Sequence, residues 1–370
     1  MGSETSCVDF ALIGHLESWQ KIANVVHALR GIEQKPLSPT DVQEIVPWIP
    51  PRTVVRVKAN SRLSGIEATG VYIDTFITPN DLRIESFKKN IEKVQYAALC
   101  ANREGASIAA LGGFTSIVLE GDHGLLPPGK TKFTTGNTLT VAYIVKGIEK
   151  IASQRGLNLK QARVLVVGAT GDIGSGCANY MAFNVGELYL CARNVNRLKV
   201  QQDKFRSLGL RSETATDPSQ YLPKADIVIM AASLAQPEYT MGMCKKGAIV
   251  CDAGYPKNVV EQGSSHDDVI LYHGGMGQVL GGYFFEPDLT KAFYEYPLPF
   301  IGHGCMLEGM LLALEHRYES FSQGRGNITV ERIEEIWSLA QKHGFALAPY
   351  FNHEGLLNIS LPKVERETMR

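Results

Sequence analysis

The chain has 370 residues, 44% of them hydrophobic, which is enough for two or three cores. Lys and Arg number 37 and Asp and Glu number 38, so the formal net charge of -1 gives no overall field that favours nucleic acid or an anionic membrane. No apolar run reaches about 18 residues and no charged-then-apolar leader is visible, which predicts no membrane span, leaves peripheral contact open and argues against secretion.

Residues 1–154 are predicted to form an N-terminal α/β domain. Strands are expected at 10–15, 54–57 and 69–76, and helices at 19–29, 82–104 and 139–154. The prolines between Pro36 and Pro51 predict an irregular connection. From 108 to 119 a strand-like run is broken by Gly112 and Gly113 and continues with hydroxyl side chains.

Polar side chains crowd the start of the helix expected at 139–154. They are Thr134, Thr135, Asn137 and Thr138. Such side chains cap helices, but this group exceeds what one cap needs, so a capping role and a binding role both stay open. The candidate substrate contacts are Gly113, Phe114, Thr135 and Asn137.

Residues 155–298 are predicted to form a Rossmann-type, doubly wound parallel sheet. A strand at 164–167 runs into a turn with Gly168, Gly171 and Gly174, and a helix follows to about residue 183. The first glycine permits a tight turn, the second lets the backbone approach a pyrophosphate, and the third lets the helix pack on the strand. Further strands are expected at 187–191, 211–215, 225–232, 248–252 and 269–273.

The end of the strand at 187–191 decides between two nicotinamide cofactors. An NAD site usually has Asp or Glu there, but this strand ends in Arg193 and Asn194, with Arg197 one turn later. A guanidinium pairs with a 2′-phosphate, so we predict NADPH, while a protein that only senses the cofactor stays an alternative. The candidate cofactor-binding residues are Gly168, Thr170, Gly171, Asp172, Ile173, Gly174, Arg193, Asn194, Arg197, Ala232, Ser233 and Gly254.

Residues 299–370 are predicted to be a helical segment that carries a candidate nucleophile. After an irregular stretch at 282–304, Cys305 opens a helix expected at 305–321, where the helix dipole lowers the pKa of a thiol. A small buried residue on an apolar helix face is the alternative. His303 could orient or deprotonate the thiol, or lie in a surface loop. A second helix is expected at 330–343, and 354–370 reads as polar and loosely held.

The cysteines and histidines bear on location and metals. The chain has 7 Cys, none in a C-x-x-C pair, which predicts free thiols in a reducing cytoplasm. No Cys or His spacing typical of a metal site is visible, so we expect no metal.

Several segments keep the order of a known family. They are 12–16, 110–117, 133–138, 166–175, 192–194, 252–258, Cys305 with Glu308 and 310–312, 327–329 and 343–345. On these segments the chain resembles the cyanobacterial long-chain acyl-(acyl carrier protein) reductases, which make fatty aldehydes. Residues 36–51, 276–300, 302–304 and those beyond 349 depart from the family pattern. These departures leave open the acyl chain length and whether the carrier is a protein or coenzyme A.

The resemblance implies reduction of a fatty acyl thioester to an aldehyde by NADPH, in lipid metabolism and alkane biosynthesis. It implies that residues 1–154 are the substrate domain and that Cys305 accepts the acyl group. It also implies that an aldehyde-deformylating oxygenase is a partner. Tyr255 follows a strand as do turns near the nicotinamide in shikimate-dehydrogenase-like proteins. The candidate catalytic residues are therefore Cys305, His303 and Tyr255. An acidic acyl carrier protein needs a basic docking surface. The candidates for it are Lys88, Lys89 and Lys93, against an ordinary solvated helix face.

Two other functions fit the same domain plan. One is an oxidoreductase of the shikimate dehydrogenase or glutamyl-tRNA reductase type that acts on another carbonyl. The other is a non-catalytic NADP-binding protein. Cys305 separates the first hypothesis from both, because reduction through an acyl-enzyme needs a nucleophile.

Overall fold

The structure, a computed structural model, describes residues 7–359 apart from 17, 32, 79–80, 82–85, 120–122, 235, 261–267, 294–295 and 325. The chain forms two units. The first comprises residues up to Ala142 together with Gly275–Ala348, and the second comprises Tyr143–Gly274 together with residues from Pro349 onward. The larger part of the second unit, Tyr143–Gly274, is therefore inserted in the first. This division differs from the three consecutive domains expected at 1–154, 155–298 and 299–370.

The first unit is built on a six-stranded sheet. Its strands are β1 (Phe10–Gly14), β2 (Arg52–Asn60), β3 (Glu67–Asp74), β4 (Ile108–Leu111), β5 (Lys132–Thr134) and β15 (Tyr283–Glu286), in the order β15-β2-β3-β1-β4-β5. From β3 to β5 the strands are parallel, whereas β2 and β15 pair antiparallel. Tyr283 lies opposite Ala59, so β15 returns from beyond the insertion to complete this sheet. That pairing is why the domain boundary expected at 298 differs from the structure.

The remaining elements of the first unit are a small antiparallel sheet and a set of helices. The sheet has the order β16-β14-β17, from β14 (Met276–Val279), β16 (Ile301–His303) and β17 (Phe345–Leu347). The helices are α1 (Trp19–Arg30), α2 (Pro39–Ile45), α3 (Phe87–Arg103), α4 (Phe114–Val118), α8 (Thr290–Phe293), α9 (Gly304–Leu314) and α10 (Val330–His343), with 3-10 turns η1 (Val46–Trp48) and η4 (His123–Leu125).

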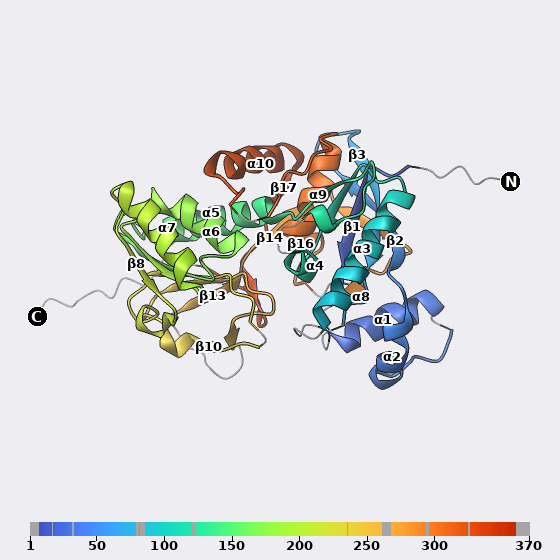
Figure 1. Ribbon diagram of the computed structural model, residues 1–370, viewed down its shortest axis with the longest axis horizontal. Helices are drawn as coiled ribbons and strands as arrows, with labels where there is room; N and C mark the ends of the chain where they lie inside the picture. The colour runs from blue at the N-terminus through green and yellow to red at the C-terminus, as the bar shows by residue number, and fades with distance from the viewer. Residues whose placement is uncertain are drawn as a thin grey trace, which may run out of the picture. The chain divides into compact units, whose positions relative to one another are not determined.

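Two helices cover opposite faces of the six-stranded sheet (Figure 1). The apolar side of α3 packs with β1, β3 and β4 through buried residues that include Val94, Ala98 and Ile13. On the other face α9 comes so close that a Cβ on Gly309 would lie 2.7 Å from the Cβ of Ala110. Because α9 is enclosed, nearly all its side chains are apolar and buried.

Four predicted elements of the first unit differ from the structure. The strand-like run expected at 108–119 is a strand only to Leu111, and Phe114–Val118 form the helix α4. The proline-rich segment contains α2, because Ser38 and Asp41 form a capping box around Pro39 at the first helical position. The stretch at 282–304 was expected to be irregular but contains β15, α8 and β16. The helix at Cys305 ends at Leu314, since His316 adopts a φ of 50°. The helix expected from 82 is described from Phe87, and 82–85 lie outside the described residues.

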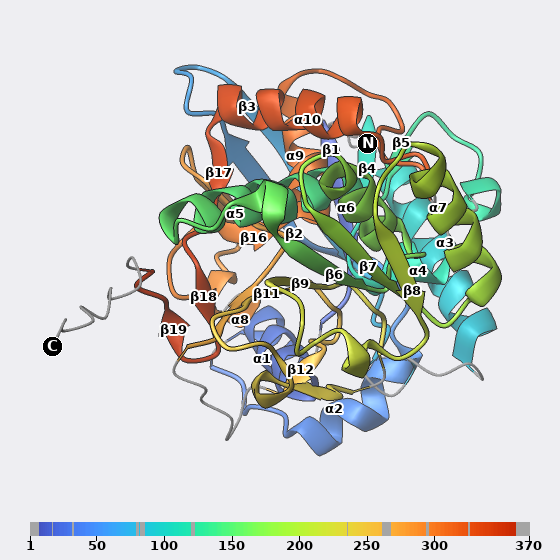
Figure 2. The ribbon, with the colours of Figure 1, turned by 90° about the vertical axis from the view of Figure 1, so that its left-hand side faces the viewer.

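The second unit has the predicted doubly wound sheet of six parallel strands. They are β6 (Arg163–Val167), β7 (Glu187–Cys191), β8 (Ser212–Ala215), β9 (Ile227–Met230), β11 (Ile249–Asp252) and β13 (Ile270–His273), in the order β13-β11-β9-β6-β7-β8. Figure 2 shows β6, β7 and β8 side by side. Continuous apolar stretches such as Val164–Val167 are typical of strands buried on both faces. The sequence prediction of this sheet is confirmed.

Helices and short strands complete the second unit. They are α5 (Asn137–Gln154), which begins in the first unit, α6 (Asp172–Ala182), α7 (Val195–Ser207), the pair β10 (Tyr239–Thr240) and β12 (Val259–Val260), the hairpin β18 (Phe351–Asn352) and β19 (Gly355–Leu356), and 3-10 turns η5 (Leu159–Gln161), η6 (Pro218–Gln220) and η7 (Met241–Met243). The hairpin occupies part of the expected loose tail, and 360–370 lie outside the described residues. Within the described part of the chain, no helix is both long and apolar enough to cross a membrane.

Candidate active site

The glycine turn of the second unit has the geometry expected of a phosphate-binding loop. Gly168 has a φ of +83°, and a Cβ there would lie 2.5 Å from the carbonyl oxygen of Ala231. A Cβ on Gly174 would lie 2.7 Å from the carbonyl carbon of Gly168, so this glycine lets α6 pack on the turn. At Gly171 a Cβ would meet only the oxygen of Gly168, at 3.2 Å. The backbone at Gly171 is therefore open to a ligand, and Asp172 and Ile173 begin α6 beside it.

The other predicted cofactor contacts lie on loops at the same edge of the parallel sheet. The strand order places the loop with Arg193 on one side of the glycine turn, and those with Ala232 and Gly254 on the other. Asn258 joins the last two loops, because its side chain accepts from the N–H of Ala232 at 3.1 Å and donates to the carbonyl of Ala232 at 2.9 Å. Buried Asp252 accepts the N–H of Gly254 at 2.9 Å. This edge is where open α/β sheets bind dinucleotides.

Of the predicted cofactor-binding side chains at this edge, one caps a helix and others are exposed. Asn194 caps α7 by accepting the N–H of Arg197 at 3.0 Å. Arg193 and Arg197 are exposed, as is Ser233, while Thr170 is half-buried. No carboxylate follows β7, so these residues fit a dinucleotide with a 2′-phosphate: the glycine turn would hold the pyrophosphate and a guanidinium the added phosphate. Tyr255 lies in the loop after β11, on the opposite side of the turn from Arg193.

Cys305 lies in the first unit, where three sequence segments converge. It follows Gly304 at the start of α9, and the backbone N–H groups of Gly113 and Met306 act to lower the pKa of its thiol. Gly136 has a φ of +68°, and a Cβ there would lie 2.6 Å from the carbonyl carbon of Cys305. On the other side, a Cβ on Gly304 would lie 2.6 Å from the Cα of Thr140. The backbone around the thiol is therefore packed against the loop after β4 and the turn between β5 and α5.

The ionisation of Cys305 differs from the sequence prediction. Burial raises the pKa of this thiol above its ordinary value, although the residue keeps part of its surface exposed. The N–H groups of Gly113 and Met306 act in the opposite direction, as expected at a helix amino terminus, but burial outweighs them. The charge of Glu308 raises the pKa further. The resting residue is therefore a thiol, and the expected low pKa was wrong.

Two histidines flank this part of the first unit. His303 is the N-cap residue of α9, and its Nε2 lies 2.9 Å from the hydroxyl of Tyr296. His15 follows β1, and its Nε2 accepts the N–H of Phe114 at 3.2 Å. Phe114 neighbours the glycine whose N–H acts on the thiol, so His15 supports the loop at the nucleophile. His15 was not among the predicted site residues; its place directly after a parallel strand is the signal that could have identified it.

The polar side chains around the start of α5 form hydrogen bonds within the protein, some of them to segments far away in the sequence. Thr134 donates to buried Glu308 at 2.6 Å, and Thr138 lies 2.6 Å from Ser322. Thr135 accepts the N–H of Asn137 at 3.4 Å, and both are buried. Glu308 and Ser322 were not predicted as site residues.

The predicted basic docking surface is smaller than expected. Lys93 is only 8% exposed and donates to the carbonyl of Phe76, because its position falls on the packed side of α3. Lys89 pairs with Asp81 at 3.5 Å and stays half-exposed, and Lys88 is exposed. Only Lys88 and Lys89 stay candidates for carrier docking.

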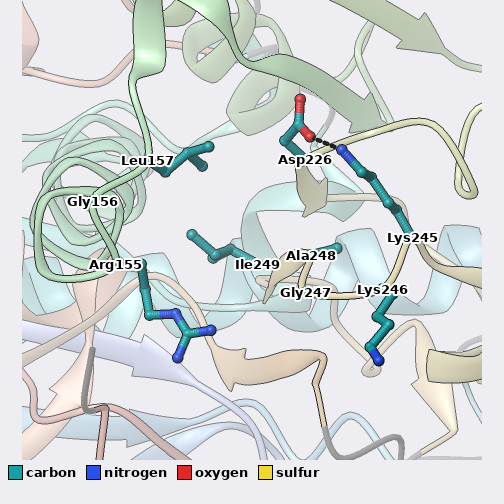
Figure 3. Close-up of a pocket in the computed structure, with 9 residues that line it drawn as sticks. All are labelled: Arg155, Gly156, Leu157, Asp226, Lys245, Lys246, Gly247, Ala248 and Ile249. Carbon is teal, nitrogen blue, oxygen red and sulfur yellow. Dashed lines mark hydrogen bonds and ion pairs between the residues drawn. The ribbon is translucent and has the colours of Figure 1, made fainter. Parts of the chain in front are cut away.

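A cavity of about 270 Å³ lies in the second unit but away from the glycine turn (Figure 3). It is lined by Arg155, Gly156, Leu157, Asp226, Lys245, Lys246, Gly247, Ala248 and Ile249. Lys245 and Asp226 form an ion pair within it. Asp226 precedes β9 and Ile249 begins β11, so the cavity is at the amino ends of the strands, the edge that dinucleotides do not use.

The comparisons with known proteins differ in how much of the chain they match. A family model described as Shikimate / quinate 5-dehydrogenase matches residues 150–273, within the second unit. The chain is 33% identical over 352 residues to the long-chain acyl-(acyl-carrier-protein) reductase of Synechococcus elongatus, covering 91% of this chain and 98% of that protein. It is 27% identical over 252 residues to the aminotransferase PigE of a Serratia species, covering 66% of this chain and 28% of that protein. The A chain of dipicolinate synthase from Bacillus subtilis aligns with 73% of this chain and 89% of its own at 11% identity, with a TM-score of 0.33.

Proposed function

The chain belongs to the family of long-chain acyl-(acyl-carrier-protein) reductases, and from this premise we propose that it reduces a long-chain fatty acyl thioester on an acyl carrier protein to the fatty aldehyde, with NADPH as reductant. The observation that carries the proposal is the setting of Cys305 at the start of α9, packed against Gly136, where the N–H groups of Gly113 and Met306 favour its thiolate form. These donors suit both a thiolate and the oxyanion that forms when a thiol attacks a thioester.

The residues around Cys305 supply the acyl-transfer chemistry. The sulfur of Cys305 bonds to the acyl carbon, the bond from that carbon to the carrier's sulfur breaks, and the thiol proton leaves with the carrier's thiol. The N–H groups of Gly113 and Met306 stabilise the charge on the acyl oxygen. NADPH, when bound at the glycine turn, supplies the hydride that reduces the acyl group. The carbon–sulfur bond then breaks, the aldehyde leaves, and His303 is our candidate for returning the proton to sulfur.

Trapping the acyl-enzyme tests this proposal. The protein is mixed with a radiolabelled fatty acyl-(acyl carrier protein) without NADPH, and the labelled residue is identified by peptide mass spectrometry. We expect label on Cys305 and no aldehyde until NADPH is added. Aldehyde formation without label on any cysteine would favour direct reduction of the bound thioester and would remove Cys305 from the mechanism.

The same experiment separates the alternative function. Reduction of another carbonyl, as by shikimate dehydrogenase, is supported by a match confined to residues 150–273, which do not include Cys305. A substrate without a thioester would leave no acyl group on this residue. Acyl-coenzyme A in place of the carrier-bound substrate tests the carrier preference, and added aldehyde-deformylating oxygenase tests that partner. We retain a reducing cytoplasm as the proposed location, because all seven cysteines are free.

A further inference from the structure

Glu308 is a fully buried carboxylate one helical turn after Cys305. A carboxylate in the interior must be compensated by hydrogen bonds. Three donors from two other segments provide this compensation. The hydroxyl of Thr134 donates to Oε1 at 2.6 Å, the hydroxyl of Ser322 to Oε1 at 2.9 Å, and the N–H of Leu139 to Oε2 at 3.0 Å.

The donors around Glu308 suit the ionised form of its carboxyl group. Each hydroxyl has one hydrogen, and those of Thr134 and Ser322 point to the carboxylate. The hydroxyl of Thr138, 2.6 Å from that of Ser322, must then donate to Ser322. In this arrangement Glu308 accepts from Thr134, Ser322 and Leu139, as an ionised carboxylate does. Because Leu139 lies in the first turn of α5, the positive end of that helix also favours the anionic form.

The network fastens the turn between β5 and α5 to the helix that carries the nucleophile. Thr134 and Leu139 bracket Gly136, whose backbone presses on that of Cys305. Ser322 closes the network from the chain after α9: its N–H donates to Thr134 at 2.9 Å, and its carbonyl accepts from Thr135 at 3.0 Å. Through Thr134 and Leu139, Glu308 thus connects this turn to the helix that carries the thiol.

The same anion acts on the thiol through its charge. Residues three apart on a helix share a face, with their Cβ atoms about 5–6 Å apart. The other ionisable groups near the thiol are His303, with its partner Tyr296, and His15 behind Phe114. Near Ser322, Arg332 donates to the carbonyl of Phe321. The charge of Glu308 raises the pKa of the thiol.

We propose that Glu308 is a positioning residue that holds the 134–139 turn against Cys305 and places a buried anion one helical turn from the sulfur. The inference rests on the proposed function for the role of Cys305 as the nucleophile. A protonated resting thiol reacts slowly with adventitious electrophiles. Acylation is therefore expected only when a thioester is bound next to the N–H groups of Gly113 and Met306.

Alkylation of Cys305 tests the charge without any substrate. The variant Glu308→Gln keeps the shape and removes the charge. Alkylation by iodoacetamide is followed at Cys305 by peptide mass spectrometry from neutral to alkaline pH. We expect the midpoint of the rate profile to move to lower pH, so that alkylation at neutral pH becomes about three to ten times faster. An unchanged or higher midpoint would overturn the proposal.

Substitutions at Thr134 test the positioning role of Glu308 and leave its carboxylate in place. They can therefore be used even if the Glu308→Gln variant does not fold. Thr134→Val removes one donor; we expect it not to lower the alkylation midpoint, and to slow acylation of Cys305 by a fatty acyl thioester about tenfold. Thr134→Ser keeps the hydroxyl and should restore acylation. Unchanged acylation in the Val variant would contradict the positioning role. If the wild-type protein is never acylated, the proposed function fails, whereas the alkylation midpoint still tests Glu308.

Discussion

Two helices of this protein begin at glycine-rich turns that use glycine for opposite purposes. At the start of α6, a side chain on Gly171 would meet one carbonyl oxygen at 3.2 Å and otherwise open space. At the start of α9, a side chain on Gly304 or Gly136 would run into the backbone of Thr140 or Cys305. The first turn is open for a ligand at Gly171, whereas the space at Gly304 and Gly136 is filled by the protein itself.

The difference shows that glycine spacing alone does not identify a binding site. What matters is what a Cβ would meet: solvent where a ligand approaches, or backbone where two segments pack. At α9 the packing leaves one reactive atom, the sulfur of Cys305, among N–H groups from two segments. At α6 the open space beside Gly171 leaves room for a phosphate at the amino terminus of the helix.

The largest effect should come from removing the reactive atom at α9. Cys305→Ser leaves a hydroxyl that stays protonated at neutral pH, and we expect aldehyde formation to fall on the order of a thousandfold or more. NADPH titration should be unaffected, since the glycine turn is in the other unit. Cys7→Ser, at an exposed thiol, is the control and should keep full activity. Comparable aldehyde formation by Cys305→Ser would remove the covalent mechanism.

Adding a methyl group to the filled turn tests whether its packing matters. Gly136→Ala forces a Cβ into the backbone of Cys305, and we expect acylation to slow about a hundredfold. Gly156→Ala is a matched control, because Gly156 has the same φ of +68° with nothing within 4 Å. Both variants carry the same backbone strain, so equal acylation rates would show that contact with Cys305 is unimportant.

The corresponding change at the open turn should affect binding and spare the fold. Gly171→Val has no positive φ to strain, but its side chain fills the space reserved for pyrophosphate. We expect NADPH affinity to fall about ten- to a hundredfold, the value of a lost hydrogen bond to a charged group. Fluorescence titration measures the affinity, and thermal melting checks that the fold is kept. Unchanged affinity would mean that the phosphates bind elsewhere.

A smaller, selective effect is expected beside the open turn. Arg193→Ala should weaken NADPH about tenfold and leave NADH nearly unchanged, because only NADPH carries the 2′-phosphate. Arg206→Ala, in the last turn of α7, is the control for loss of one positive charge. Equal losses for both dinucleotides would contradict the assignment of NADPH.

The smallest effect concerns the surface of the first unit, outside both turns. Reversing the charges of Lys88 and Lys89 should raise the KM for carrier-bound substrate about two- to fivefold at low salt and leave a short acyl thioester unaffected. The same increase for both substrates would exclude this face as the docking surface. Lys93 is left out, because its burial would confuse docking with stability.

The sequence predicts the second unit well because its determinants are local. The strand β6, its glycine turn and α6 follow one another within residues 163–182, and the later strands recur in order. In the first unit, β15 pairs with β2 across more than two hundred residues, and Glu308 meets Thr134 across 174 positions. The periodicity of hydrophobic residues does not indicate contacts between residues that are so far apart in the sequence. Ser38 and Asp41 have the spacing of a capping box, which indicates a helix, but the surrounding prolines favour an irregular connection. The raised pKa of Cys305 depends on burial, which position on a helix does not reveal.

The split of the first unit has a consequence for the newly made chain. The strands β6 to β13 are synthesised as one uninterrupted stretch. In contrast, β2 cannot pair with β15, its antiparallel neighbour, until the inserted unit has been synthesised. Until then β2 is an unpaired sheet edge, and the sheet face that α9 later covers is bare. We therefore expect the second unit to fold first and the surroundings of Cys305 last. A chain stopped before residue 275 would hold its cofactor loop but lack its nucleophile, and its open edge would invite aggregation.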